Sequence, residues 1–172
     1  MSVLYLECPA ERLPELYALR ATVWLAEGAY PGAFPKGTWS DHHDSFRRHW
    51  IVLNDDGRVV AGASLAIYEH LRQIDEPEAY EKYALATEGP VAAPARVVVH
   101  PANRASGIAQ RLLDVQDDAA RAAGATLAVR QASPVMRRLL ERRGWHHHGP
   151  GPEDPRFPRT EFSVMSLNLR GA

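Results

Sequence analysis

The sequence has 172 residues, of which 45% are hydrophobic, so one domain with its own core is expected over residues 1–172. Its 20 basic and 21 acidic residues give a formal charge of −1, which argues against nucleic acid or an anionic membrane as the main partner. Cys8 is the single cysteine, and no apolar run approaches the roughly 20 residues of a membrane span. We therefore expect a cytoplasmic protein with neither a disulfide nor a signal peptide.

The N-terminal half predicts one helix and a hairpin. Residues 3–7 favour a short strand, and apolar side chains spaced by three and four predict a helix over 9–24. Residues 28–40 hold three glycines and two prolines, which indicates an irregular loop. Two apolar runs, 49–53 and 59–68, flank an Asp-Gly turn and predict a β-hairpin.

Residues 69–93 predict a long connection with one short helix inside 69–83. Connections of this length are uncommon in compact domains unless they line or gate a site.

The C-terminal half predicts a parallel strand–helix–strand unit. Its first strand, 95–100, is opened by Pro94, its helix covers 107–123, and its second strand covers 125–130. A second helix over 134–143 and strands over 145–148 and 161–169 follow, with a proline-rich segment between those last two strands.

The turn between residues 101 and 107 has the features of an anion site. The first N–H groups of the following helix have no partners inside that helix, and the helix dipole favours negative charge there. Gly107 and its small neighbours let an anion approach the backbone, and Arg104 adds a guanidinium suited to phosphate. Neither a G-x-x-x-x-G-K-[ST] loop nor a G-x-G-x-x-G fingerprint occurs in the sequence, so this turn predicts a pyrophosphate site of another kind.

The hexapeptide Arg104-Ala105-Ser106-Gly107-Ile108-Ala109 resembles the [RQ]-x-x-G-x-[GA] signature of the GNAT N-acetyltransferase superfamily. The later Arg142–Trp145 resembles the family's aromatic-after-glycine motif, and the element order is similar over nearly the whole chain. This resemblance implies an α/β (α+β) single domain with a mixed central sheet of about six to seven strands, a βαβ acyl-CoA-binding unit and flanking helices.

The resemblance also implies the acyl donor and its site. The pyrophosphate of acetyl-CoA would bind the backbone of residues 104–109, and the pantetheine would lie between strands 95–100 and 125–130. Amides near Val98 and Val99 would face the thioester carbonyl. No metal is implied, because thioesters are already activated. The expected binding residues are Val97, Val98, Val99, Arg104, Ala105, Ser106, Gly107, Ile108 and Ala109.

Two residues are candidates for proton transfer. Glu69, at the end of the third strand, is the first candidate for a general base, and His100, at the end of the central strand, is the second. Many family members carry a tyrosine where this chain has Leu140, so the leaving thiolate would take its proton from Tyr68, Ser133 or water, or leave unassisted.

The run His146-His147-His148 invites a metal hypothesis. No cysteine or carboxylate follows at a zinc-finger spacing, and neighbouring residues of a strand face opposite sides, so no zinc site is expected.

Arg20, Trp24, Asp41 and Asp44 are spaced as in the acyl-homoserine-lactone and N-acyl amino acid synthase branch of the superfamily. That branch carries a further arginine, expected within Gly62–Ala66, and this chain lacks it. The alternative hypothesis is a salt-bridged scaffold in which Arg20 pairs with Asp41 or Asp44 and holds the loop at 28–40.

The resulting prediction is an N-acetyltransferase that moves an acetyl group from acetyl-CoA to an amine of a small molecule or peptide. Two alternatives stay open: an N-acyl amino acid synthase-like enzyme with a longer acyl donor, and a non-catalytic CoA-binding sensor. The family is often dimeric, so a homodimer is a further expectation.

Overall fold

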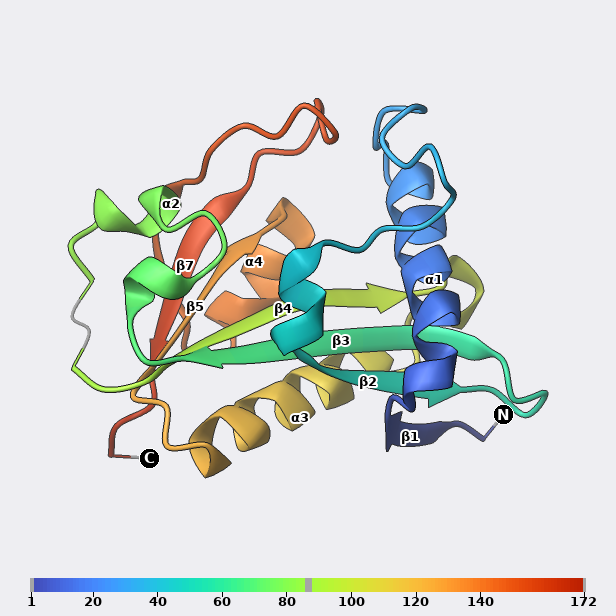
Figure 1. Ribbon diagram of the computed structural model, residues 1–172, viewed down its shortest axis with the longest axis horizontal. Coiled ribbons are helices and arrows are strands. Elements are labelled where there is room, and N and C mark those ends of the chain that lie inside the picture. The colour runs from blue at the N-terminus through green and yellow to red at the C-terminus, as the bar shows by residue number, and fades with distance from the viewer. Residues whose placement is uncertain (1, 86–87, 172) are drawn as a thin grey trace.

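The computed structural model describes residues 2–85 and 88–171, and its centre is one mixed sheet (Figure 1). The strand order is β1-β2-β3-β4-β5-β7-β6, and every neighbouring pair is antiparallel except β4 and β5, which are parallel. The predicted fold class is confirmed, with seven strands. They are β1 (Leu4–Glu7), β2 (Arg48–Leu53), β3 (Val59–Tyr68), β4 (Val91–Val99), β5 (Leu127–Ala132), β6 (His146–Pro150) and β7 (Ser163–Asn168).

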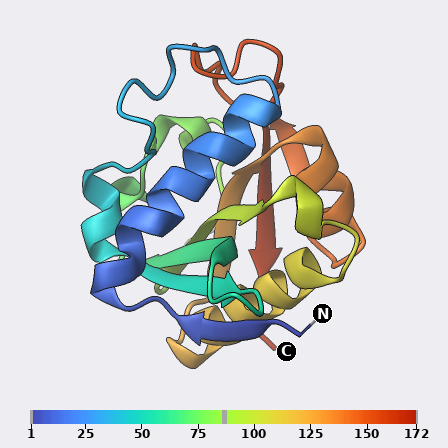
Figure 2. The same ribbon diagram turned by 90° about the vertical axis from the view of Figure 1, so that its right-hand side faces the viewer.

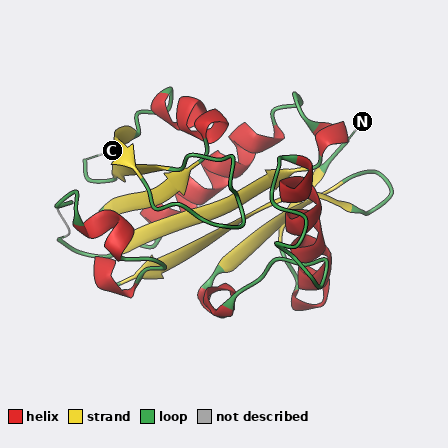
Figure 3. Ribbon diagram, turned by 90° about the horizontal axis from the view of Figure 1, so that it is seen from above, coloured by secondary structure: helices red, strands yellow, loops and turns green. Residues whose placement is uncertain are grey.

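Helices cover both faces of this sheet (Figure 3). In β2, Ile51 packs with α1 on one face, whereas Trp50 and Val52 belong to the core cluster on the other face, to which α3 contributes. The α-helices are α1 (Leu13–Ala26), α2 (Glu78–Glu81), α3 (Ile108–Ala122) and α4 (Pro134–Glu141). The 3-10 helices are η1 (Ala10–Arg12), η2 (His42–Phe46), η3 (Leu71–Gln73) and η4 (Pro101–Asn103).

Strand β4 begins at Val91, so the prediction that Pro94 opens it is wrong. Pro94 pairs with Leu65 of β3 and lies beyond the last pair that β4 forms with β5. A proline is tolerated where a strand has an open side, because its missing N–H then removes no ladder bond there.

β4 and β5 separate after two paired positions, Val91 with Leu127 and Ala92 with Ala128. Beyond this point β4 contains a bulge, because Arg96 and Val97 together lie opposite Ala63 of β3. Bulges bend and twist a strand, and Arg96 has a positive φ of 56°. The bulge and the divergence together leave a gap in the sheet between β4 and β5.

Gly62 lies where α1 crosses β3. A Cβ at this position would overlap the side chain of Leu16 and come 2.9 Å from the carbonyl oxygen of Trp50. We expect Gly62→Ala to lower the free energy of unfolding by about 1–3 kcal/mol, the usual cost of overpacking a core.

Urea denaturation measures this effect, with Gly32→Ala as the control, because a Cβ there meets only the flexible ring of Tyr30, which is itself half exposed. Equal stability of the two variants would contradict the close packing of α1 on β3.

Candidate functional site

Two cavities lie on either side of the β4 bulge. The larger cleft, of about 520 Å³, runs along Val97–Val99 between the start of α3 and the start of α4. The polar cavity, of about 250 Å³, is lined by Ala93–Arg96 of β4 and by residues 129–131 of β5. Trp24 of α1 lines both cavities, so they adjoin at one end of the gap.

The residues predicted to bind the anion lie along the larger cleft. All the expected binding residues line it except Ser106, whose hydroxyl donates to the carbonyl of Asn103 at 2.6 Å. Gly107 precedes α3 with φ 80°, a left-handed conformation that glycine adopts without a steric penalty.

The amides of this turn are free to bind a ligand. In the part of the chain that the structure describes, no hydrogen bond uses the backbone N–H groups of residues 105–110. A Cβ built at Gly107 would meet nothing within 4 Å, so the space beside the turn is open. Unpaired amides at a helix start, beside open space, fit a diphosphate.

Arg104 is held at the edge of this turn by two contacts. Its Nη1 pairs with the carboxylate of Glu27, the residue that follows α1, and its Nε donates to the carbonyl of Val99 at 3.3 Å. The Val99 carbonyl therefore faces the cleft rather than β3. A bound diphosphate and Glu27 would both interact with Arg104.

The loop at 28–40 and the proline-rich loop at 151–162 meet over the C-terminal end of α1 (Figure 2). The N–H of Tyr30 in the loop at 28–40 donates to the carbonyl of Arg156 at 2.9 Å. The rings of Trp24 and Phe157 lie 4.7 Å apart between centroids. These contacts form an aromatic wall shared by both loops.

A buried ion network supports the loop at 28–40. Arg20 is fully buried, its Nη1 binds the Asp44 carboxylate at 3.0 Å, and it donates to the carbonyl of Trp39 at 3.5 Å. Arg96 binds Asp41 and Asp44 from the other side. The hypothesis that Arg20 is part of a salt-bridged scaffold is confirmed.

Burial and charge shift the titration of this network. Burial raises the pKa of Asp44, but attraction by Arg20 and Arg96 outweighs it, so the pKa lies below its ordinary value. Burial lowers the pKa of Arg20 to about 10, so the guanidinium stays charged at neutral pH. Burial also lowers the pKa of His49, whose Nδ1 lies 3.1 Å from Nη2 of Arg20.

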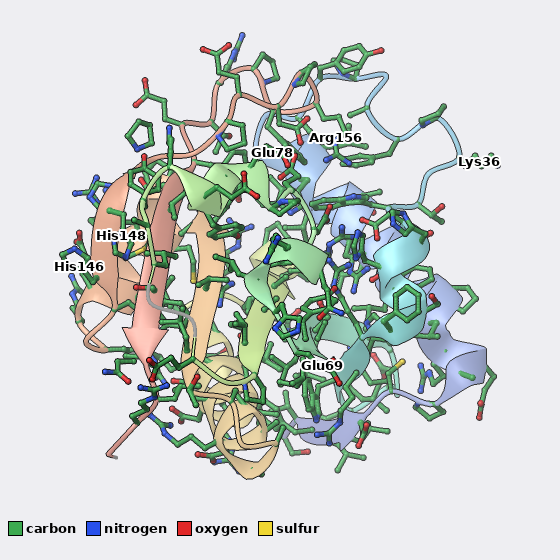
Figure 4. The ribbon with its side chains drawn as sticks, turned by 60° about the vertical axis from the view of Figure 1, so that its left-hand side comes forward. Lys36, Glu69, Glu78, His146, His148 and Arg156 are labelled. Atoms are coloured by element: carbon green, nitrogen blue, oxygen red, sulfur yellow. The ribbon has the colours of Figure 1, made fainter. Side chains whose placement is uncertain are left out.

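The structure does not bring the two proton-transfer candidates to the cavities. Glu69 is exposed and lies away from Arg156, which lines the polar cavity (Figure 4). His100 lines neither cavity, and its Nδ1 accepts from the N–H of Ala102 at 3.2 Å.

Hydroxyl groups line both cavities: those of Tyr68 and Tyr80 in the polar cavity, and those of Ser133 and Thr160 in the larger cleft. Leu140 is buried in the core, so that position offers no hydroxyl. Tyr68 lines the polar cavity with its hydroxyl 3.1 Å from Nδ1 of His43, and Ser133 lines the larger cleft while capping α4.

Sequence reasoning missed most charged residues of the polar cavity, among them Asp75, Glu76, Arg96 and Arg130. The long connection at 69–93 was expected to line a site, and it supplies the first two. Arg96 and Arg130 could have been found from the sequence, because each is a charged residue inside an otherwise apolar strand.

The histidine run lies on the edge strand β6 (Figure 4). The rings of His146 and His148 are 4.5 Å apart, and His148 bonds Ser166 at 2.7 Å. Among the described residues, no group of three or more His, Cys, Asp or Glu side chains could hold a metal ion. Within the same residues, no helix is long and apolar enough to cross a membrane.

The sequence profile of the Acetyltransferase (GNAT) family matches residues 15–145. No curated protein has a significantly similar sequence.

Solved structures of this family share the fold. A GNAT acetyltransferase from Staphylococcus aureus Mu50 superposes with a TM-score of 0.68 at 14% identity, covering 98% of this chain and 100% of its own. Arylalkylamine N-acetyltransferase 2 from Aedes aegypti gives 0.72 at 12% identity, covering 99% and 100%. FeeM, an N-acyl amino acid synthase from uncultured soil microbes, gives 0.76 at 10% identity, covering 99% and 92%. The resemblance to the superfamily is confirmed, and similarity at these identities concerns the fold alone.

Asp44 is the centre of the buried network, and its loss leaves Arg20 buried without a carboxylate. We expect Asp44→Asn to lower the free energy of unfolding by about 3–5 kcal/mol at pH 7. Because the folded-state pKa of Asp44 is lowered, its contribution is complete above the unfolded-state pKa of about 3.9 and is lost as the pH falls through the folded-state pKa.

Denaturation curves at several pH values measure this, and Glu7→Gln is the control. Glu7 pairs with Arg48 while both side chains are about half exposed, so the control should cost about 1 kcal/mol or less. If the difference in free energy of unfolding between wild type and Asp44→Asn did not change with pH, this result would argue against the charged network.

Proposed function

The chain belongs to the GNAT family of acetyltransferases, and we propose that it transfers an acetyl group from acetyl-CoA to the amine of a small molecule. The observation that carries this proposal is the row of unpaired amides at residues 105–110, facing a cleft that adjoins a second, polar cavity. The donor would occupy the larger cleft and the acceptor the polar cavity.

The β4 bulge brings these two partners together. Arg96 lines the polar cavity, whereas Val97 and Val99 line the larger cleft. The N–H of His100 donates to Val60 of β3 at 2.8 Å, so the backbone polar groups of Val99 point to the open side of the strand. A thioester carbonyl in the gap could accept a hydrogen bond from this side as the amine attacks and the C–S bond breaks.

The size of the polar cavity supports a small acceptor. At about 250 Å³ it lies just below the range of roughly 300–1,000 Å³ typical of ligand pockets. Trp39, Tyr80 and Phe162 provide apolar surface for the body of such a molecule.

Glu76 is the carboxylate that we propose as proton acceptor. It lines the polar cavity and accepts a hydrogen bond from Nε2 of Gln131 at 2.7 Å. Asp41, Asp75 and Asp154 also line the cavity, but each is paired with an arginine. Glu69 and His100 stay predictions from the sequence and lie outside the cavity lining.

A longer acyl donor is the second candidate, favoured by the apolar walls that Val97, Met136 and Leu139 give the larger cleft. Comparing thiol release from acetyl-CoA and octanoyl-CoA tests it. Binding of CoA without thiol release from either donor would favour the sensor alternative.

Replacing Gly107 tests the donor site. We expect Gly107→Asp to weaken CoA binding by about tenfold or more, because a carboxylate would project beside the diphosphate and repel it. Gly124→Asp is the matched control, since Gly124 has a similar φ of 76° at the opposite end of the same helix.

Calorimetric titration with CoA measures both variants. Unchanged affinity in a folded Gly107→Asp variant would refute the donor site.

Replacing Glu76 and Glu69 separates the two candidates for the base. We expect Glu76→Gln to lower kcat/KM roughly 100-fold below the pKa of the acceptor amine, where proton removal matters most. Glu69→Gln should leave the rate unchanged, because this side chain lies outside the cavity lining.

The pH–rate profiles of both variants decide between them. The reverse outcome would restore Glu69 as the base and remove Glu76 from the mechanism.

A further inference from the structure

Arg130 crosses beneath the gap between β4 and β5. It is 5% exposed, and its Nη1 donates to Oε1 of Gln116 of α3 at 3.3 Å. Nε2 of Gln116 donates in turn to the carbonyls of Ala95 at 3.1 Å and Ser64 at 2.7 Å. The Arg130 side chain therefore extends from β5 toward β4, below the point where the strands separate.

The charge of Arg130 has no carboxylate partner within the described residues. Its Nε is buried and makes no hydrogen bond. Asp117 is the carboxylate that most favours its charged form, but Asp117 already bonds Arg143 at 3.1 Å. Burying a guanidinium without a counter-ion is costly, so the position favours an anion supplied from outside.

The other arginines of the polar cavity differ from Arg130 in this respect. Arg156 binds Asp154, Arg96 binds Asp41, and Arg47 lies 3.3 Å from Asp44. They carry their own counter-ions within the chain.

Part of Arg130 contributes to the lining of the polar cavity. Nη2 makes no hydrogen bond in the described chain, yet it is not among the buried polar atoms, so it retains accessible surface. Arg130 lines the polar cavity, where β4 and β5 flank the gap. Burial lowers the pKa of Arg130 to about 10, so the group still carries its charge at neutral pH.

We propose that Arg130 binds a carboxylate of the acceptor, which makes the acceptor an amino acid or another amine with a carboxylate close to its nitrogen. This inference rests on the proposed function. Guanidinium groups bind carboxylates by charge-assisted hydrogen bonds. The carboxylate of the acceptor would lie close to its reacting nitrogen, because both groups would bind at the gap between β4 and β5.

The experiment compares matched acceptors with acetyl-CoA as donor. L-phenylalanine is paired with phenethylamine and with L-phenylalaninamide, and L-leucine is paired with isopentylamine and L-leucinamide. Thiol release gives kcat and KM for each. We expect at least about a tenfold preference in kcat/KM for the amino acids, expressed mainly in KM, because the charge-assisted hydrogen bond to Arg130 is lost with the carboxylate.

Variants assign this preference to Arg130. Arg130→Gln should abolish it and Arg130→Lys should restore part of it, whereas Arg156→Gln, which alters a paired arginine of the same cavity, should retain it. If Arg130→Gln does not fold, the wild-type comparison and Arg130→Lys still decide.

Three results would overturn the inference. Equal or better turnover of the acceptors that lack a carboxylate would overturn it while leaving the proposed function intact. A preference that survives in a folded Arg130→Gln variant would do the same. CoA binding without turnover of any acceptor would overturn both proposals.

Discussion

The early separation of β4 from β5 is the constraint on which the rest of the structure depends. Two strands that share only two paired positions leave backbone groups and space exposed inside the sheet, where hydrogen bonds would otherwise close it. The bulge at Arg96 and Val97 turns β4 away, and Gln116 donates hydrogen bonds to the carbonyls of Ser64 and Ala95, the β3–β4 pair beside the bulge. Both cavities adjoin this gap. The space for a donor and an acceptor therefore exists because β4 and β5 pair incompletely.

Charge within the molecule is arranged around the same gap. Arg20, Asp44 and Arg96 form a buried network in which opposite charges face each other, which offsets the cost of removing them from water. This network anchors the loop at 28–40 beside the polar cavity. Arg130 lies below the gap without a carboxylate partner in the described chain. The paired charges of the network stabilise the scaffold, whereas the charge of Arg130 is available to a ligand.

Much of the fold could be predicted from local patterns, and the errors have physical reasons. The apolar periodicity of α3, the glycine before it and the valine run of β4 are properties of neighbouring residues, and α3 and the end of β4 form within a residue or two of the expected positions. The start of β4 was misplaced because a proline usually ends a strand, whereas here the partner strand has already diverged. The long connection at 69–93 was expected to line a site. Glu76 lines the polar cavity, whereas Glu69, seven residues earlier, lies outside both cavities. No periodicity of the sequence distinguishes these two glutamates.

The sequence by itself determined the strand–helix–strand unit and the unpaired amides at Gly107, because helix starts, glycine conformations and apolar spacing depend on residues close together in the chain. Only the tertiary structure decided that β4 and β5 diverge, that Arg20 meets Asp44, and that Arg130 has no counter-ion among the described residues. These features depend on contacts between segments far apart in the sequence. Burial and the pairing of charges are properties of the packed chain, because both depend on which distant groups exclude water from one another.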